Sequence, residues 1–208
     1  MKKDPYRRIV WIYDLLAEPA AGILRRIALG VYPPRESIYI LDAGCGTRTQ
    51  LELLSRPGCK LYEVDSSAAM LGAARRKLGE AAELSLQDIS HMTFPDRMFD
   101  LVTLVLVLHE LPALLRPAVL TECKRVLKED GCMLLIDYQF GPYSFPLGPL
   151  LRIPRRFMEM GVGREHYANY RDFQKRGGLE PLLAETGLSI DKRKVALGGV
   201  AAVHLLRP

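Results

Sequence analysis

The 208-residue sequence contains only four cysteines, at positions 45, 59, 123 and 132. No two of them form a CxxC pair, and their spacing fits neither a zinc site nor a disulfide framework. Disulfides are rare in the reducing cytoplasm, and this sparse use of cysteine suits that compartment. We therefore expect free thiols, a cytoplasmic location and no metal site.

The sequence also lacks a hydrophobic run that could span a membrane, which takes about 20 residues. Its densest apolar run, LVTLVLVL at 101–108, is far shorter. The start of the chain is basic, but Asp14 and Glu18 interrupt the apolar part that follows. We therefore expect neither a transmembrane helix nor a signal peptide.

Nucleic-acid recognition signals are missing as well. The net charge is +5, from 29 basic and 24 acidic residues, but no basic stripe interleaved with aromatics stands out. We therefore expect no nucleic-acid partner. The charge suits a generally basic protein, and an anionic substrate or membrane surface is the alternative reading.

Residues 38–138 alternate between short apolar runs and amphipathic segments. The expected strands are 38–44, 59–65, 82–88, 100–108 and 132–138, and the expected helices are 50–55, 66–79 and 112–128. A serine precedes the second of these helices and a glycine closes it, and an EDG turn at 129–131 follows the third. This alternation predicts an α/β fold with a parallel sheet and right-handed crossovers.

The two ends of the chain follow other patterns. Residues 6–29 are expected to form an amphipathic helix in two pieces, broken near Pro19. Residues 139–178 are rich in Gly, Pro, Arg and aromatics and are too long for a passive loop, so we expect a lid or substrate wall. A helix at 179–186 and an antiparallel hairpin with a turn at 198–199 should close the fold.

The stretch ILDAGCGTRTQ at 40–50 places Asp42, Gly44 and Gly46 just after the first strand. Ligands of open α/β sheets bind at the carboxyl ends of strands, and glycine allows close approach. Asp65 ends the second strand, where an acid can accept hydrogen bonds from ribose hydroxyls. The stretch does not fit the dinucleotide fingerprint GxGxxG well, because Thr49 stands where the last glycine belongs. An acid at position 42 would also sit poorly beside a pyrophosphate and is better suited to a cationic ligand such as S-adenosylmethionine.

Four stretches occur in the order of the motifs of class I S-adenosylmethionine-dependent methyltransferases. They are ILDAGCGTRTQ, LYEVDSSAAML, LQDISHMTFPDRMFDLVTLVLVLHEL and ECKRVLKEDGCMLLIDY, within 38–138. The sequence most resembles the type 11 group, which includes ubiquinone/menaquinone-biosynthesis C-methyltransferases. The resemblance implies a Rossmann-like fold, with a mostly parallel seven-stranded sheet, a C-terminal antiparallel hairpin and helices on both faces.

The resemblance also implies one domain over 1–208, in which a helical cap (1–37), a cofactor core (38–138), a lid (139–178) and a closing helix and hairpin (179–208) follow one another. S-adenosylmethionine would be the cofactor and S-adenosylhomocysteine the product. The implied cofactor-binding residues are Asp42, Gly44, Cys45, Gly46, Asp65, Ser66, Met70, Asp88, Ile89 and Leu106. Of these, Asp65 would hold the ribose, and Asp88 and Ile89 would contact the adenine.

The sequence departs from the family pattern at Arg48, where a third glycine is usual. Arg48 either points into the site, where it would crowd the cofactor or pair with its carboxylate, or points to solvent. Tyr13 resembles the tyrosine of the family's N-terminal helix, which closes over the cofactor, and it is a candidate catalytic residue together with His109; simple helix packing is the alternative.

Methyl transfer needs alignment more than a dedicated base. His109 follows the fourth strand, where an imidazole can act as a general base, or it merely bonds the backbone. The stretch 164–173 supplies candidate substrate-binding residues, which are His166, Tyr167, Tyr170 and Arg171 together with His109. At helical spacing 166 shares a face with 170, and 167 shares one with 171.

We therefore expect methylation of a small, partly apolar acceptor such as a quinone-like compound, a lipid or another metabolite, by a monomer or homodimer. Residues 143–161 mix large apolar side chains with arginines. They form either a flap that touches a membrane surface or a lid that packs on its own domain. The fourth strand ends in LVLHEL, without the [DN]PP[YF] of amino-methylating enzymes. A non-catalytic S-adenosylmethionine-binding protein and a nicotinamide oxidoreductase are the alternatives.

Overall fold

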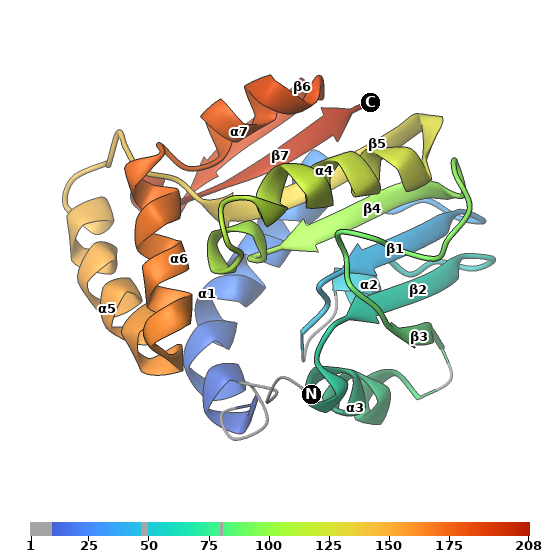
Figure 1. The fold of residues 1–208 in the computed structure, drawn as a ribbon, viewed down its shortest axis with the longest axis horizontal. Helices are drawn as coiled ribbons and strands as arrows, with labels where there is room; N and C mark the ends of the chain where they lie inside the picture. Colours follow the sequence, from blue (N-terminus) through green and yellow to red (C-terminus); the bar gives the residue numbers. More distant parts are fainter. Residues whose placement is uncertain (1–9, 47–49, 80) are drawn as a thin grey trace.

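Seven strands form one sheet in the order β3-β2-β1-β4-β5-β7-β6 (Figure 1). The computed structural model describes residues 10–46, 50–79 and 81–208, and of 10–20, 77–78 and 152–158 it describes the backbone. The strands are β1 (Tyr39–Ala43), β2 (Lys60–Asp65), β3 (Glu83–Leu86), β4 (Phe99–Val105), β5 (Leu127–Tyr138), β6 (Ser189–Ala196) and β7 (Ala201–Arg207). The first five run parallel, whereas β7 is antiparallel to β5 and β6. The predicted fold class is therefore confirmed.

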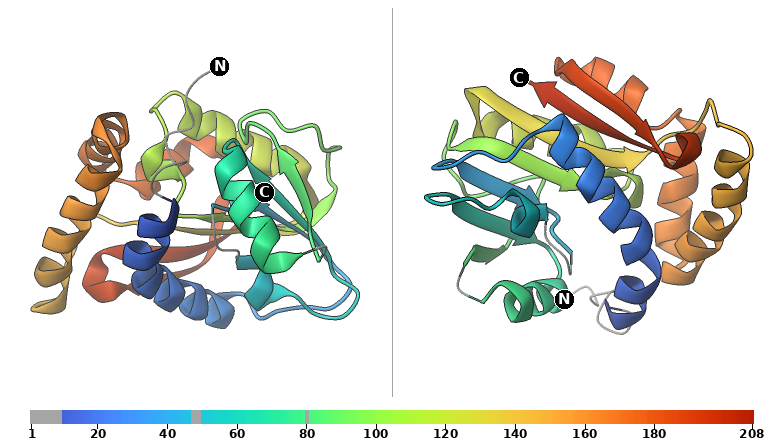
Figure 2. Two further views of the ribbon diagram at one scale, coloured as in Figure 1. Left: turned by 90° about the horizontal axis from the view of Figure 1, so that it is seen from below. Right: turned by 180° about the vertical axis from the view of Figure 1, so that it is seen from behind.

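Helices cover both faces of this sheet (Figure 2). They are α1 (Val10–Val31), α2 (Gln50–Leu54), α3 (Ala68–Leu78), α4 (Leu115–Val126), α5 (Leu147–Val162), α6 (Arg164–Lys175) and α7 (Leu179–Thr186), with 3-10 turns η2 (Leu108–Glu110) and η3 (Leu197–Gly199). α5 and α6 stand side by side next to the carboxyl end of β4 (Figure 1). None of the helices described is long and apolar enough to cross a membrane.

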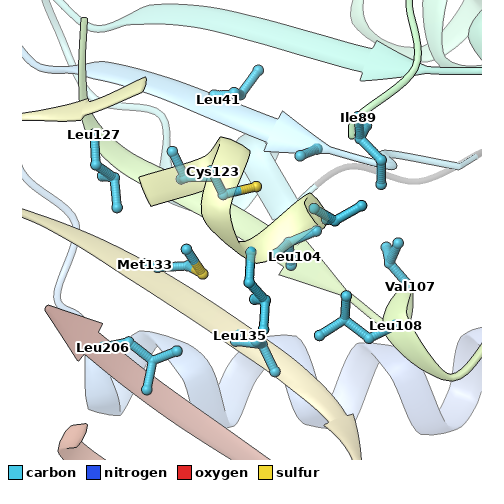
Figure 3. Packing of buried hydrophobic residues seen from close by; sticks show 14 of the residues in the cluster. Leu41, Ile89, Leu104, Val107, Leu108, Cys123, Leu127, Met133, Leu135 and Leu206 are labelled. Carbon is cyan, nitrogen blue, oxygen red and sulfur yellow. The ribbon is translucent and has the colours of Figure 1, made fainter. Parts of the chain in front are cut away.

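Two hydrophobic cores lie on opposite sides of the sheet. One packs Leu24 and Leu51, from α1 and α2, against the sheet. The other packs the sheet against α4 and α7, and Figure 3 shows Cys123 of α4 among the side chains of β4 and β5. Because the central strands are buried on both faces, they read as nearly continuous apolar runs in the sequence.

The α3 helix begins and ends as its sequence predicts. The Ser67 hydroxyl accepts a hydrogen bond from the Met70 N–H at 3.2 Å, which satisfies one of the free donors of the first turn. At the other end Gly79 takes a φ of 60°, which glycine reaches without steric penalty.

Three expectations about element boundaries are wrong. α1 runs unbroken from Val10 to Val31 and includes Pro19. The proline removes one helical hydrogen bond without ending the helix. β4 stops at Val105, since Leu106 turns to a φ of 59° and η2 follows. The expected turn at 129–131 lies within β5, at a register shift where Phe99 pairs with Leu127 and Leu101 with Cys132.

His204 is a buried polar residue of β7. Its side chain is 1% exposed, and neither ring nitrogen has a hydrogen-bond partner among the residues described. Burial, helped by the positive charge of Arg193, lowers the pKa of His204 to about 4. The folded protein therefore holds this imidazole neutral.

We expect His204→Leu to stabilise the protein at pH 7 by about 1 kcal/mol, because it removes a desolvated, unpaired polar group. The difference in unfolding free energy between His204→Leu and the wild type should grow as the pH falls. An unfolded imidazole has a pKa of about 6.5, so the wild-type protein loses stability as the pH falls from that value through about 4. Denaturant titrations at pH 7 and pH 5 measure the difference. The exposed His91→Leu is the control, and a destabilised His204→Leu at both pH values would contradict the argument.

Candidate active site

The glycine turn after β1 is held between β2 and the segment that follows β4. The N–H groups of Gly44 and Cys45 donate to the Val64 carbonyl at 2.7 and 3.2 Å. Gly44 has a φ of +75° and Gly46 of +61°, both in the left-handed region. A Cβ on Gly44 would lie 2.8 Å from Cγ2 of Val107, so the turn needs glycine there for its close approach as well as its φ.

Three carboxylates gather beneath this turn, on the face of the sheet that α1 and α2 cover. Asp42 lies beside Glu63 in the register of β1 and β2, and Asp65 ends β2. The Thr103 hydroxyl and the Gln50 N–H donate to Asp42 at 2.5 and 3.3 Å. The parallel register thus concentrates negative charge under the glycine turn.

Burial shapes the chemistry of this acidic group. Asp42 is 1% exposed, and desolvation raises its pKa to about 6 despite the hydrogen bonds that favour its charged form. Burial and the nearby Glu63 raise the pKa of the Cys45 thiol, so Cys45 stays protonated. A cationic ligand at the turn would favour the ionised form of Asp42.

Asp65 links the glycine turn to α3. Its carboxylate accepts the Gly46 N–H at 3.0 Å and the Ser67 N–H at 2.8 Å. It therefore lies at the point where the ends of β1 and β2 meet, which is where the sequence places a ribose.

The other predicted cofactor residues are spread around this point. Ser66 is exposed, while Met70 and Ile89 are buried. Asp88 is exposed, and its Oδ1 accepts the backbone N–H and the hydroxyl of Ser90 at 2.8 and 2.7 Å. Leu106 is partly buried at the turn that ends β4. Their assignment to a cofactor stays a prediction, as do those of Asp42, Gly44, Cys45, Gly46 and Asp65.

Two further predicted residues fall outside the part of the chain that is described. Arg48 and the two flanking threonines lie within 47–49, and the side chain of Tyr13 lies in the stretch whose backbone alone is described.

A second polar cluster lies past β4, on the other face of the sheet. The His109 ring is 1% exposed, and its Nδ1 lies 2.7 Å from Oδ1 of Asp137 at the end of β5. Its Nε2 lies 3.7 Å from Oε2 of Glu159 in α5, and Nε2 of His166 in α6 lies 2.5 Å from the same oxygen. The Tyr138 hydroxyl donates to the other oxygen of Glu159 at 2.6 Å.

The carboxylates of this cluster act against the burial of His109. Desolvation lowers the pKa of His109, but Asp137 and Glu159 outweigh it and raise the pKa to about 9. Burial likewise opposes ionisation of Glu159, yet His109 and His166 hold the pKa of that carboxyl below its usual range. An imidazolium is a poor base at neutral pH, so this environment does not favour the base role predicted for His109.

Of the predicted acceptor residues, His109, His166 and Tyr170 come together with aromatic neighbours. Ring centroids of His109 and Tyr170 are 6.3 Å apart, and Tyr138 lies 4.5 Å from His109. Tyr167 stacks on Tyr170 at 6.1 Å. Arg171 does not join them, because its position on α6 leaves its side chain exposed.

Arg116 fixes α6 against the segment after β4, and sequence analysis missed it. Its guanidinium, 2% exposed, donates to the carbonyls of Leu108 and Asn169 and to Asp172 at 2.8–3.1 Å. Asn169 in turn donates to the Glu110 carbonyl at 2.8 Å. The sequence could have predicted Asp137 as a site residue, because it is an acid at the end of a strand like Asp42. No sequence pattern points to Arg116 or Glu159.

Residues 41–135 match the methyltransferase domain family. A demethylmenaquinone methyltransferase of Thermotoga maritima is 33% identical over 100 residues, which make up 47% of this chain and 42% of that protein. The ubiquinone/menaquinone biosynthesis C-methyltransferase UbiE of Paraburkholderia phymatum is 26% identical, with 93% of this chain and 86% of that protein covered.

Solved structures show the same fold at low identity. An S-adenosylmethionine-dependent methyltransferase of Aquifex aeolicus superposes with a TM-score of 0.61 at 18% identity and covers 88% of each chain. The mitomycin 7-O-methyltransferase MmcR gives a TM-score of 0.63 at 16% identity, over 95% of this chain and 60% of that one.

The sheet order, the match over residues 41–135 and these relatives support a class I S-adenosylmethionine-dependent methyltransferase. Its cofactor is therefore S-adenosylmethionine. Within that class it is of the type similar to the UbiE C-methyltransferases of ubiquinone and menaquinone biosynthesis.

We expect Gly44→Ala to destabilise the protein by about 2–4 kcal/mol, through a strained φ and collision with Val107. Gly46→Ala is the matched control. It has a similar φ, but a Cβ there meets no atom of the described residues within 4 Å, so its loss should stay near 1 kcal/mol. Denaturant unfolding measures both, and adding Val107→Ala to Gly44→Ala should recover part of the difference. Equal losses in the two single variants would contradict the close-approach argument.

Proposed function

We propose that this methyltransferase acts on a small, partly apolar acceptor with a ring, such as a quinone-like compound. The main support is a group of packed aromatic rings, those of Tyr138, Tyr167 and Tyr170. The ring of His109 packs on Tyr138, and His109 lies two residues after Val107, which is next to the glycine turn. Aromatic side chains bind flat apolar rings well. The curated relatives that methylate demethylmenaquinone or serve ubiquinone biosynthesis support the same class of acceptor.

The cofactor would lie over the ends of β1, β2 and β4. We assign it the ten residues predicted from the sequence, with Asp65 on the ribose and the acidic group under the glycine turn facing the methionine end. That acidic group fits a ligand whose ammonium and sulfonium are cationic. The bound cofactor supplies a methyl group on a positively charged sulfur.

The residues of the chain would align the acceptor and exclude water, which is most of what this reaction requires. A base is optional for an acceptor whose nucleophilic atom is already activated. We therefore propose an orienting role for His109, through its hydrogen bond to Asp137, and Tyr13 stays a predicted catalytic residue.

We further propose that 139–178 acts as the lid of the acceptor site, between the cofactor core at 38–138 and the closing segment at 179–208. Phe145 and Leu150 are 89% and 65% exposed at the start of α5. Exposed apolar side chains of this size fit transient contact with a membrane surface that carries a lipid-soluble acceptor. The proposal covers a monomer or a homodimer.

We expect Asp65→Ala to weaken S-adenosylmethionine binding by about 1–3 kcal/mol, through lost charge-assisted hydrogen bonds. Isothermal titration calorimetry measures the affinity. Asp191→Ala is the control, since Asp191 is paired with Arg207 at the far edge of the sheet. An unchanged affinity in Asp65→Ala would place the ribose elsewhere.

The acceptor class is tested with a methyl-labelled cofactor and a panel of quinols, phenols, lipids and aliphatic amines. We expect transfer to ring-bearing acceptors, and we expect Tyr170→Ala to raise their KM about tenfold without changing cofactor affinity. Transfer to aliphatic amines alone, or an unchanged KM in a folded Tyr170→Ala, would contradict the proposed acceptor site.

A further inference from the structure

The cluster between the sheet and the lid helices has the composition of a metal site. His109, Glu159 and His166 each offer a ligand atom, and these three atoms all lie within 4.8 Å of one another. All three side chains are buried. They come from η2, α5 and α6, so the fold rather than local sequence brings them together.

We propose that His109, Glu159 and His166 bind one divalent transition-metal ion. Two imidazoles and one carboxylate form a common ligand set for Zn²⁺ and for other ions of the first transition row. Ligand atoms of a tetrahedral zinc ion lie about 3.3 Å apart. The Nε2 of His109 lies 3.7 Å from Oε2 of Glu159, and Nε2 of His166 lies 2.5 Å from the same oxygen, so the two distances bracket that spacing and the second pair would open on metal binding.

The residues around the three ligands orient them as the outer shell of a metal site does. Metal-binding histidines usually give their other ring nitrogen to a carboxylate. Asp137 does this for His109 by accepting from Nδ1, which leaves Nε2 directed at the cluster. Tyr138 holds the second oxygen of Glu159, which leaves Oε2 as the ligand atom.

The charge of the cluster also suits a cation. Asp137 and Glu159 are 1% and 3% exposed, and Glu110 adds a third carboxylate with Oε1 3.9 Å from Nε2 of His109. Buried carboxylates are retained at a low free-energy cost only when they are paired or bind a metal ion. A divalent ion would displace the Nε2 proton that these carboxylates otherwise hold on His109, release it to solvent, and supply the positive charge in its place.

The position of the site indicates what else the ion would bind, and this step rests on the proposed function. The cluster lies among the aromatic rings that we assign to the acceptor, with His109 two residues from Val107 at the glycine turn. An oxygen of the acceptor is the ligand that would complete the coordination. Metal binding itself does not depend on that step.

The experiment uses the full chain without a histidine tag, freed of metal by a chelator and titrated with Zn²⁺ against a chromophoric competitor in the absence of S-adenosylmethionine. We expect one saturable site per chain with a Kd below about 10 μM. Glu159→Gln and His166→Ala should weaken it at least 100-fold, and Asp137→Asn about 10-fold or more. Glu165→Gln is the matched control, because Glu165 lies on α6 but is exposed, and it should bind like the wild type.

Absence of a site this tight in the wild-type protein would overturn the proposal, as would folded Glu159→Gln and His166→Ala variants that bind normally. Circular dichroism reports folding. Should the variants not fold, Co²⁺ added to the wild-type protein decides. Intense ligand-field bands of a four- or five-coordinate ion support the site, and the weak spectrum of hydrated Co²⁺ overturns it. Calorimetry with S-adenosylmethionine is run separately, so loss of cofactor binding would sink the proposed function and not the metal site.

Discussion

Parallel pairing of β1, β2, β4 and β5 is the constraint on which the site depends. Parallel strands end at the same edge of a sheet, so acids at strand ends meet there whatever their distance in sequence. Asp42 and Asp65 end up beneath one turn across 23 residues, and Asp137 lies at the end of β5 beside the segment that follows β4. Carboxylates so placed are stable only with donors or cations around them.

The sheet separates these acids into two groups with different surroundings. Asp42 and its neighbours lie on the α1 and α2 face, where Thr103 and Gln50 hold Asp42. Asp137 lies on the other face and holds His109. Val107, two residues before His109, lies beside Gly44 at the edge of the sheet, so that a Cβ on Gly44 would come within 2.8 Å of its Cγ2. A change that widens the glycine turn therefore has to displace Val107, which precedes the His109 segment.

The sequence predicts the core of this arrangement because the relevant signals are local. Strand–helix alternation, the Ser67 cap and the acids at 42 and 65 each depend on a few neighbouring residues. The sequence predicts a lid or substrate wall over 139–178 but not its helix α5, since Gly148 and the prolines of 143–161 are typical of a loop. The structure explains Gly148, because a Cβ there would collide with the Gly198 carbonyl where α5 begins against η3. That contact joins residues 50 positions apart, so a local sequence pattern cannot predict it.

Glu159 escaped prediction for the same reason, although its two partners His109 and His166 were predicted as substrate-binding residues. Arg116 fastens α6 to the segment after β4 through five groups on rigid elements, so His166 has little freedom relative to His109. α5 has no comparable anchor of that kind in its described residues, and Glu159 is where it meets both histidines and Tyr138. Glu159 therefore contributes to the position of α5 through these contacts, beside the packing of Gly148 against Gly198. A proton or a cation that changed the partners of Glu159 would change these contacts of α5.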